Sequence, residues 1–134
     1  MSVSLTTGSV VCRLRGLTVA ATPEERVRQR VIDQLLAGGY PWHLWTCEVA
    51  HPRWGAVAGR ADLLFHVAAT RALAVIEVKV ARPRPIDLEQ AHTYGRQWGC
   101  QVAAVTDGVS WLVEQRIDGE WQTVGHFPVF AEWG

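Results

Sequence analysis

Two acidic residues and a lysine lie within one short, otherwise apolar stretch of the chain, Asp62 to Lys79. Apolar runs at 63–67 and 73–80 flank a short link, a pattern typical of a β-hairpin. If the chain turns at the 69–70 bond, Asp62 lies opposite Glu77, and alternation along the strand puts Glu77 and Lys79 on one face. A shift of one residue would separate these side chains, so the grouping depends on this register.

These three side chains are suited to metal-assisted chemistry on a phosphodiester. Asp62 and Glu77 offer the hard oxygen ligands that Mg²⁺ prefers, with water and phosphate completing its shell, and Mn²⁺ can replace it. The backbone carbonyl of Val78 is a third candidate ligand. Lys79, beside the metal, would orient a water molecule or balance charge in the transition state. The alternative is an exposed cross-strand pair of opposite charges with a small structural effect.

A helix is expected to begin after Thr22 and to end at Gly38 and Gly39. Thr22 is the expected N-cap, and Glu25, three residues later, completes the pattern of a capping box. At about 100° per residue, Glu24 falls on the apolar stripe of this helix, whereas Glu25 falls toward its edge. From the local sequence, both acids could serve only capping and the helix macrodipole.

The remaining segments predict an α/β or α+β domain with a central mixed sheet, flanked by helices on one face or on both. The weakly patterned first 20 residues contain at most a short strand at 10–17. Strands are expected at 42–50, 101–106, 111–116 and 121–127, the last two around an Asp118-Gly119 turn. A second helix is expected at 86–98, with Asp87 as its cap, after a basic, proline-rich loop at 81–85.

Composition limits the possible functions. The chain has 134 residues, 49% of them hydrophobic, which suits one domain with a substantial core. Its formal net charge is zero, so a nucleic-acid partner requires a local basic patch. Three widely spaced cysteines without a CxxC pair indicate neither a zinc site nor a disulfide framework and favour a reducing, cytoplasmic setting. No apolar run approaches the roughly 20 residues of a membrane span.

Several short motifs follow one another in a defined order along residues 22–115. They are T-P-E-E-R-V-R-Q at 22–29, Glu48, G-R-A-D ending at Asp62, I-E-V-K ending at Lys79, Gln90 with Tyr94, and V-T-D-G at 105–108. This ordered set resembles the N-terminal domain of type I restriction enzyme R subunits, which belongs to the PD-(D/E)xK nuclease superfamily. The I-E-V-K element alone is unspecific; the order of the whole set is what makes the resemblance specific.

The resemblance implies a restriction-endonuclease-like fold and Mg²⁺-dependent cleavage of DNA. Asp62 and Glu77 match the metal-binding acids, although Ala61 stands where the motif has proline, and Lys79 matches the lysine. The helix acid that completes such sites matches Glu24 or Glu25. The stripe favours Glu24, since capping gives Glu25 another task.

Further residues of the resemblance concern DNA. Gln90 and Tyr94 match a motif that supports the site and contacts DNA in the RecB-like branch, with ordinary helix packing as the alternative. Arg60, Arg82 and Arg84 are expected to form a phosphate-binding patch near the charged end of the hairpin. That patch is extended by Arg53 and by helix residues Arg26, Arg28 and Arg30, and an evenly solvated surface is the alternative.

The expected partners follow from what these residues lack. R subunits carry a helicase-like motor after this domain and the present residues do not, so a helicase or modification partner is expected. Cutting both strands requires two sites and therefore a homodimer. The second hypothesis is a non-cutting nucleic-acid-binding or regulatory module of the same fold. A third is a metal-dependent phosphodiesterase acting on RNA or nucleotides.

Overall fold

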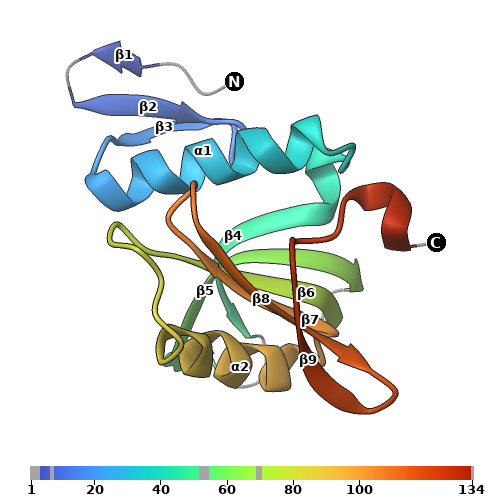
Figure 1. The fold of residues 1–134 in the computed structure, drawn as a ribbon. Coiled ribbons are helices and arrows are strands. Elements are labelled where there is room, and N and C mark those ends of the chain that lie inside the picture. The colour runs from blue at the N-terminus through green and yellow to red at the C-terminus, as the bar shows by residue number, and fades with distance from the viewer. Residues whose placement is uncertain (1–3, 7, 52–54, 69–70, 134) are drawn as a thin grey trace.

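The computed structural model describes residues 4–6, 8–51, 55–68 and 71–133. A six-stranded mixed sheet in the order β4-β5-β6-β7-β8-β9 forms its centre. Two helices, α1 (Pro23–Ala37) and α2 (Asp87–Trp98), lie on opposite sides of this sheet (Figure 1). The strands are β4 (Trp45–His51), β5 (Gly55–Ala68), β6 (Arg71–Val78), β7 (Val102–Thr106), β8 (Trp111–Ile117) and β9 (Glu120–Val124). The predicted mixed sheet flanked by helices is confirmed.

Alternating side chains of the sheet build two separate apolar cores. Leu63 and Ile76 belong to the core that α1 covers, together with Ile32. Leu64 and Val75 point to the other core, which α2 covers. This is the period-two pattern of a sheet buried on both faces. The sequence left open whether the helices cover one face of the sheet or both. The structure places one helix on each face.

The predicted register of the β5–β6 hairpin is confirmed next to Asp62. Leu63 pairs with Ile76, and Leu64 pairs with Val75, as a turn at the 69–70 bond requires. Register irregularities occur further along, around His66, and residues 69–70 themselves lie outside the described residues. The irregularities are confined to the turn end, so the acidic end keeps the expected alignment.

The chain passes from β6 through α2 to β7, which pairs with β6 in parallel. Two parallel strands need such a crossover connection, because a tight turn reverses the chain direction and would make the strands antiparallel. All five residues of β7 are buried, which confirms the predicted central strand at 101–106. The predicted β8–β9 hairpin is also confirmed. Asp118 and Gly119 both have positive φ, 51° and 81°, as a two-residue hairpin turn demands.

The helix boundaries agree with the sequence at most ends. The Thr22 side chain accepts a hydrogen bond from the backbone N–H of Glu25 at 3.1 Å, as an N-cap should. The capping prediction for α2 was wrong: Asp87 is the first helical residue, and its carboxylate accepts from the Arg84 N–H at 2.7 Å. The strand expected from residue 42 begins only at Trp45, after a 3₁₀ turn, Trp42–Leu44.

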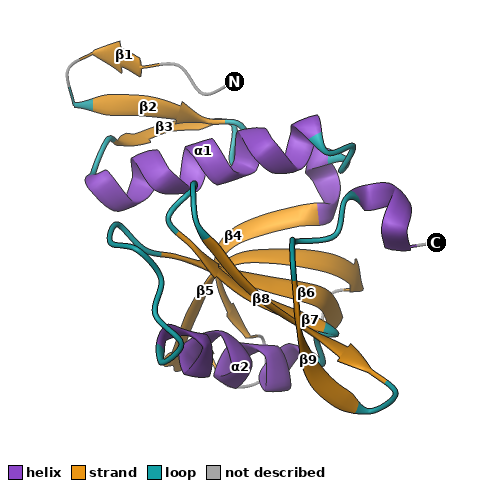
Figure 2. Cartoon of the chain, viewed as in Figure 1, coloured by secondary structure: helices purple, strands orange, loops and turns teal. Residues whose placement is uncertain are grey.

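The first 20 residues form more structure than their sequence indicated. Instead of one strand at 10–17, an antiparallel meander contains β1 (Ser4–Thr6), β2 (Ser9–Cys12) and β3 (Leu17–Ala20). Figure 2 shows this second sheet beside α1. Cys12 of β2 is fully buried and belongs to the core between α1 and the main sheet. No helix within the described residues is long and apolar enough to cross a bilayer.

Candidate functional site

The carboxylates of Asp62 and Glu77 each accept a backbone hydrogen bond across the β5–β6 hairpin. The backbone N–H of Asp62 donates to Glu77 Oε2 at 3.0 Å. One step further along β6, the N–H of Val78 donates to Asp62 Oδ2 at 2.9 Å. Each carboxylate thus accepts a backbone donor of the opposite strand. Backbone donors of two paired strands hold the acids, so their positions are rigid.

Glu77 is buried, with only 3% of its surface exposed. Burial and the nearby charge of Asp62 raise the pKa of Glu77 to about 8, although the Asp62 N–H, Lys79 and Arg28 oppose the shift. Two carboxylates placed this close destabilise each other's charged forms. A divalent cation between them would relieve that repulsion, so the pair has the electrostatics of a cation site.

Lys79 extends the pair toward α2. Its ammonium Nζ donates to Gln90 Oε1 at 3.3 Å, and the Gln90 amide donates to Tyr94 Oη at 3.4 Å. Gln90 and Tyr94 are therefore neighbours on one helix face, as their spacing predicted. The backbone of Lys79 is held by the carbonyl of Thr106 at 2.9 Å, within the V-T-D-G motif. Lys79 is also the sole lysine among thirteen Lys and Arg residues.

Arg28 lies among the acids of the site, a position that the sequence did not indicate. It is 2% exposed, and its guanidinium donates to Asp62 Oδ1 at 2.9 Å, Glu25 Oε1 at 2.6 Å and Glu24 Oε1 at 3.0 Å. The expectation that Arg28 belongs to an exposed basic patch was wrong. Its spacing of three and four residues from the two glutamates was the available signal, because such pairs meet on a helix.

The two helix acids are buried in the opposite order from that expected. Glu24 has 54% of its side chain exposed and contacts Arg28, whereas Glu25 is buried. Glu25 accepts from Arg15 at 2.7 Å and from the Gln29 amide at 2.8 Å, besides Arg28. Burial opposes the charge of Glu25, but these hydrogen bonds outweigh it and lower its pKa. The buried stripe of α1 therefore runs through Glu25, and Glu24 lies beside it.

Glu48 on β4 joins the same cluster. Its neighbours Cys47 and Val49 pair with Leu63 and Ala61, so Glu48 lies opposite Asp62. Its φ of 53° is unusual for a residue other than glycine and marks a local irregularity of the strand. Glu48 Oε2 accepts from Arg15 at 3.3 Å, and its other oxygen lies 3.5 Å from Arg28.

Most of the basic residues expected to contact phosphate are exposed, and buried Arg28 is the exception among those described. Arg60 donates to the Glu48 carbonyl at 3.2 Å, and Arg82 and Arg84 lie on the loop that follows Lys79. Arg26 and Arg30 are exposed on α1, whereas Arg53 lies outside the described residues. These side chains remain a predicted phosphate-binding surface.

The chemistry of the donors fits a divalent cation at Asp62 and Glu77. Two rigid carboxylates, one with a raised pKa, suit a metal that takes its other ligands from water and phosphate. The further acids, Glu24, Glu25 and Glu48, face the guanidinium of Arg28 instead. Among the residues that the structure describes, no three His, Cys, Asp or Glu side chains converge as a metal centre. Whether the Val78 carbonyl is a ligand stays a prediction.

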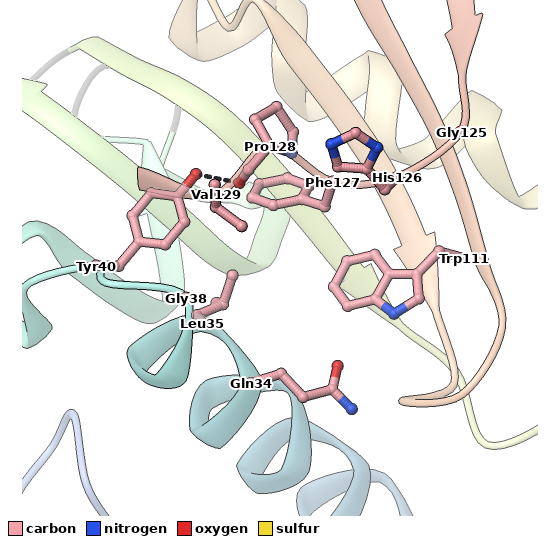
Figure 3. A pocket seen from close by; sticks show the side chains of 10 residues that line it. All are labelled: Gln34, Leu35, Gly38, Tyr40, Trp111, Gly125, His126, Phe127, Pro128 and Val129. Atoms are coloured by element: carbon pink, nitrogen blue, oxygen red, sulfur yellow. Dashed lines mark hydrogen bonds between the residues drawn. The ribbon is translucent and has the colours of Figure 1, made fainter. Parts of the chain in front are cut away.

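A cavity lies at the end of α1 that is remote from the acidic cluster. An apolar pocket of about 250 Å³ lies between the end of α1 and the segment after β9, and Figure 3 shows the side chains that line it. Tyr40, Trp111 and Phe127 contribute aromatic side chains to its wall, and Gln34 and His126 contribute polar groups. Glu24 and Gln34 are ten residues apart, about 15 Å along the helix. The pocket is therefore separate from the acidic cluster.

The fold and the cluster together define a class: a mixed α+β domain with an acid-rich site built on one hairpin. A family model described as the type I restriction enzyme R protein N terminus matches residues 23–127. The chain belongs to this family, which connects it with restriction. Comparisons with curated proteins and with solved structures gave no match.

Proposed function

We propose that this domain is a Mg²⁺-dependent DNA endonuclease of the PD-(D/E)xK type that acts in restriction. The observation that carries the proposal is the Asp62–Glu77 pair, held rigidly on a hairpin with Lys79 beside it. A pair of carboxylates of which one is buried costs stability, and such a cost is commonly found at functional sites. Family membership supports the connection with restriction.

In this proposal the chain's own groups divide the work. Asp62 and Glu77 would hold the cation, which when bound supplies a Lewis acid and an activated water molecule. Gln90 positions the ammonium of Lys79, which stabilises negative charge as the phosphodiester is cleaved. Arg28 holds Asp62 from the side of α1. The exposed Arg60, Arg82 and Arg84 would contact the DNA backbone.

Two copies of the domain would be needed to cut both strands, so we propose that a homodimer acts on duplex DNA. A helicase or modification subunit of a restriction complex would supply the choice of target. A single-strand nick by isolated domains and a double-strand break by the assembled complex are the corresponding products.

The direct test is Mg²⁺-dependent nicking of supercoiled plasmid by the purified chain and three variants. Asp62→Asn, Glu77→Gln and Lys79→Met each remove a charge with little change in size, and each should lower nicking at least a hundredfold. Lys79→Arg tests whether charge alone suffices. Glu89→Gln, on an exposed position of α2, is the matched control and should cut like the parent chain. Unchanged nicking in all three site variants would refute the proposal.

A second candidate function is a non-cutting nucleic-acid-binding module. Arg28 favours it, because the guanidinium already neutralises the acids that would complete a metal centre. Such a module would bind duplex DNA through its exposed arginines, with an affinity that falls steeply with salt.

Manganese binding separates the two functions. Titration with Mn²⁺, followed by electron paramagnetic resonance, should show one bound ion in the parent chain and none in Asp62→Asn. Salt-sensitive DNA binding without Mn²⁺ binding or cleavage would establish the second function and exclude the first.

A further inference from the structure

Arg28 is a permanent cation buried within the acidic cluster. Only 2% of its surface is exposed, and its terminal nitrogen Nη2 lies 2.9 Å from Asp62 Oδ1 and 3.0 Å from Glu24 Oε1. Glu48 Oε1 lies 3.5 Å from the same nitrogen. An arginine side chain keeps its charge throughout the physiological pH range. Carboxylates from α1, β4 and β5 therefore surround a single group that is always positive.

The distances around this nitrogen are those of hydrogen bonds and ion pairs, not those of metal coordination. The three carboxylate oxygens lie 2.9 to 3.5 Å from Nη2. Mg²⁺ holds its oxygen ligands at about 2.0–2.1 Å, so each oxygen would have to move by on the order of 1 Å to coordinate one ion. As long as the guanidinium occupies the centre, these three carboxylates stay too far apart to bind a metal ion there.

The other carboxylate oxygens near Arg28 are also held by side chains of the domain. Glu25 Oε1 accepts from Arg28 at 2.6 Å and from Arg15 at 2.7 Å. Glu25 Oε2 accepts from the Gln29 amide at 2.8 Å, and Glu48 Oε2 accepts from Arg15 at 3.3 Å. The domain therefore neutralises these acids with its own guanidinium groups.

The Asp62–Glu77 pair differs from these acids. Glu77 Oε2 accepts from a backbone N–H at 3.0 Å, and Asp62 Oδ2 accepts from the Val78 N–H at 2.9 Å. Backbone amides orient the two carboxylates without bringing a full positive charge. Each carboxylate oxygen has two lone pairs, so an oxygen that accepts one hydrogen bond can still bind a cation.

We infer that Arg28 takes the place of a second metal ion, so that the site loads one divalent cation, at Asp62 and Glu77. The inference rests on the proposed nuclease function and adds to it the number of ions bound. Sites with two metal ions are common in enzymes that cleave phosphodiesters. Here Glu24 and Glu48 hold Arg28 and do not bind metal, in contrast to the helix acid that the resemblance implied as a ligand.

The test is titration of the whole chain with Mn²⁺, followed by electron paramagnetic resonance in the absence of DNA. The parent chain should bind one ion. Glu24→Gln and Glu48→Gln each remove a charge from a side chain that is 54% and 49% exposed, respectively. Both variants should still bind one ion, with an affinity lowered less than about tenfold, because water screens exposed charges. Glu89→Gln, outside the cluster, is the control and should match the parent chain.

Changes at Arg28 itself give the opposite result. Arg28→Met should bind two Mn²⁺ ions, and Mn²⁺ should raise its melting temperature more than that of the parent chain. Arg28→Lys, which keeps the charge, should bind one ion. If Arg28→Met fails to fold, Glu24→Gln and Glu48→Gln decide the matter.

Three results would overturn the inference. They are two ions in the parent chain, a single ion in folded Arg28→Met, and a loss of binding in Glu24→Gln or Glu48→Gln as complete as in Asp62→Asn. Each of these leaves the proposed nuclease function standing, because an ion is still bound by the parent chain. A parent chain that binds no ion would refute both the inference and the metal-dependent function.

Discussion

At its amino-terminal end, α1 buries Glu25, Arg28 and Gln29 among charged groups, whereas its carboxyl-terminal end is buried among aromatic rings. At the first end, hydrogen bonds between ionised side chains define the geometry. Just beyond the second end, Tyr40 contacts Trp45 and Phe65 edge to face, with ring centroids 5.2 and 5.0 Å apart. One helix thus uses two different means of burial within 15 residues.

The difference shows where the molecule gives up stability. Near the acidic cluster, Arg28 Nε and Gln29 Oε1 are buried without a hydrogen-bond partner in the described part of the chain, and Glu77 has a raised pKa. The aromatic end has one such atom, Trp45 Nε1, while its Tyr40 hydroxyl donates to the Pro128 carbonyl at 2.7 Å. Unpaired polar atoms and repelling charges cost free energy, so the acidic end is the one that gives up more stability.

Replacing Arg28 at the charged end of α1 should have the largest effect on stability. Arg28→Met leaves Glu25 and Asp62 without their shared cation in a buried setting. We expect the free energy of unfolding to fall by about 3–5 kcal/mol, the usual result of removing one partner of a buried pair. Urea unfolding followed by tryptophan fluorescence measures it.

Arg26→Met, on an exposed position of the same helix, is the control and should change stability by less than about 0.5 kcal/mol. Equal stability of Arg28→Met and Arg26→Met would mean that buried Arg28 contributes no more to the free energy of unfolding than an exposed arginine.

Glu77 should make stability depend on pH in an unusual direction. Its pKa rises from 4.5 to about 8 on folding, so the folded state keeps a proton that the unfolded state has lost. The stability that protonated Glu77 contributes is present below pH 4.5 and is lost as the pH rises through about 8. The loss is on the order of 5 kcal/mol across this range.

Glu77→Gln keeps the acceptor for the Asp62 N–H and cannot ionise. The stability of Glu77→Gln relative to the parent chain should therefore increase between pH 5 and pH 8. Thermal unfolding at a series of pH values, with a metal chelator present, would show this. Glu89→Gln supplies the control. A constant difference across the pH series would contradict the raised pKa.

Tyr40→Phe tests the aromatic end alone. It leaves the Pro128 carbonyl and the Trp133 indole N–H without their shared hydroxyl. We expect a loss of about 2 kcal/mol, because the buried Pro128 carbonyl and the part-buried indole N–H both lose a partner while ring packing is kept. Plasmid nicking should be unchanged. A variant that unfolds normally but no longer cuts would show that the two ends of α1 are coupled.

Thr22→Ala should have the smallest effect. It removes the side chain that caps the charged end of α1 and should cost about 1 kcal/mol. Thr22→Ser, which keeps the hydroxyl, is the control and should stay within about 0.5 kcal/mol of the parent chain. Differential scanning calorimetry can resolve the difference, and equal melting temperatures for all three chains would show that the cap is dispensable.

Local patterns were sufficient for much of the fold. Alternation and turn residues predicted the β5–β6 register beside Asp62, the Asp118-Gly119 turn and the buried strand β7, because these depend on neighbours in sequence. The N-terminal meander was missed because its short strands carry no clear period. Its burial comes from packing against α1 and the main sheet.

The site divides in the same way. The residue types and spacing on one hairpin were enough to pair Asp62 with Glu77 and to place Lys79 next to them, because strand geometry is regular. Only the tertiary structure decided that Arg28 lies among the acids and that Glu25 rather than Glu24 is buried. The Arg28 contacts join α1 to the hairpin and to β4. Helix periodicity says which side chains share a face but not how far that face is rotated toward the sheet, which is set by packing.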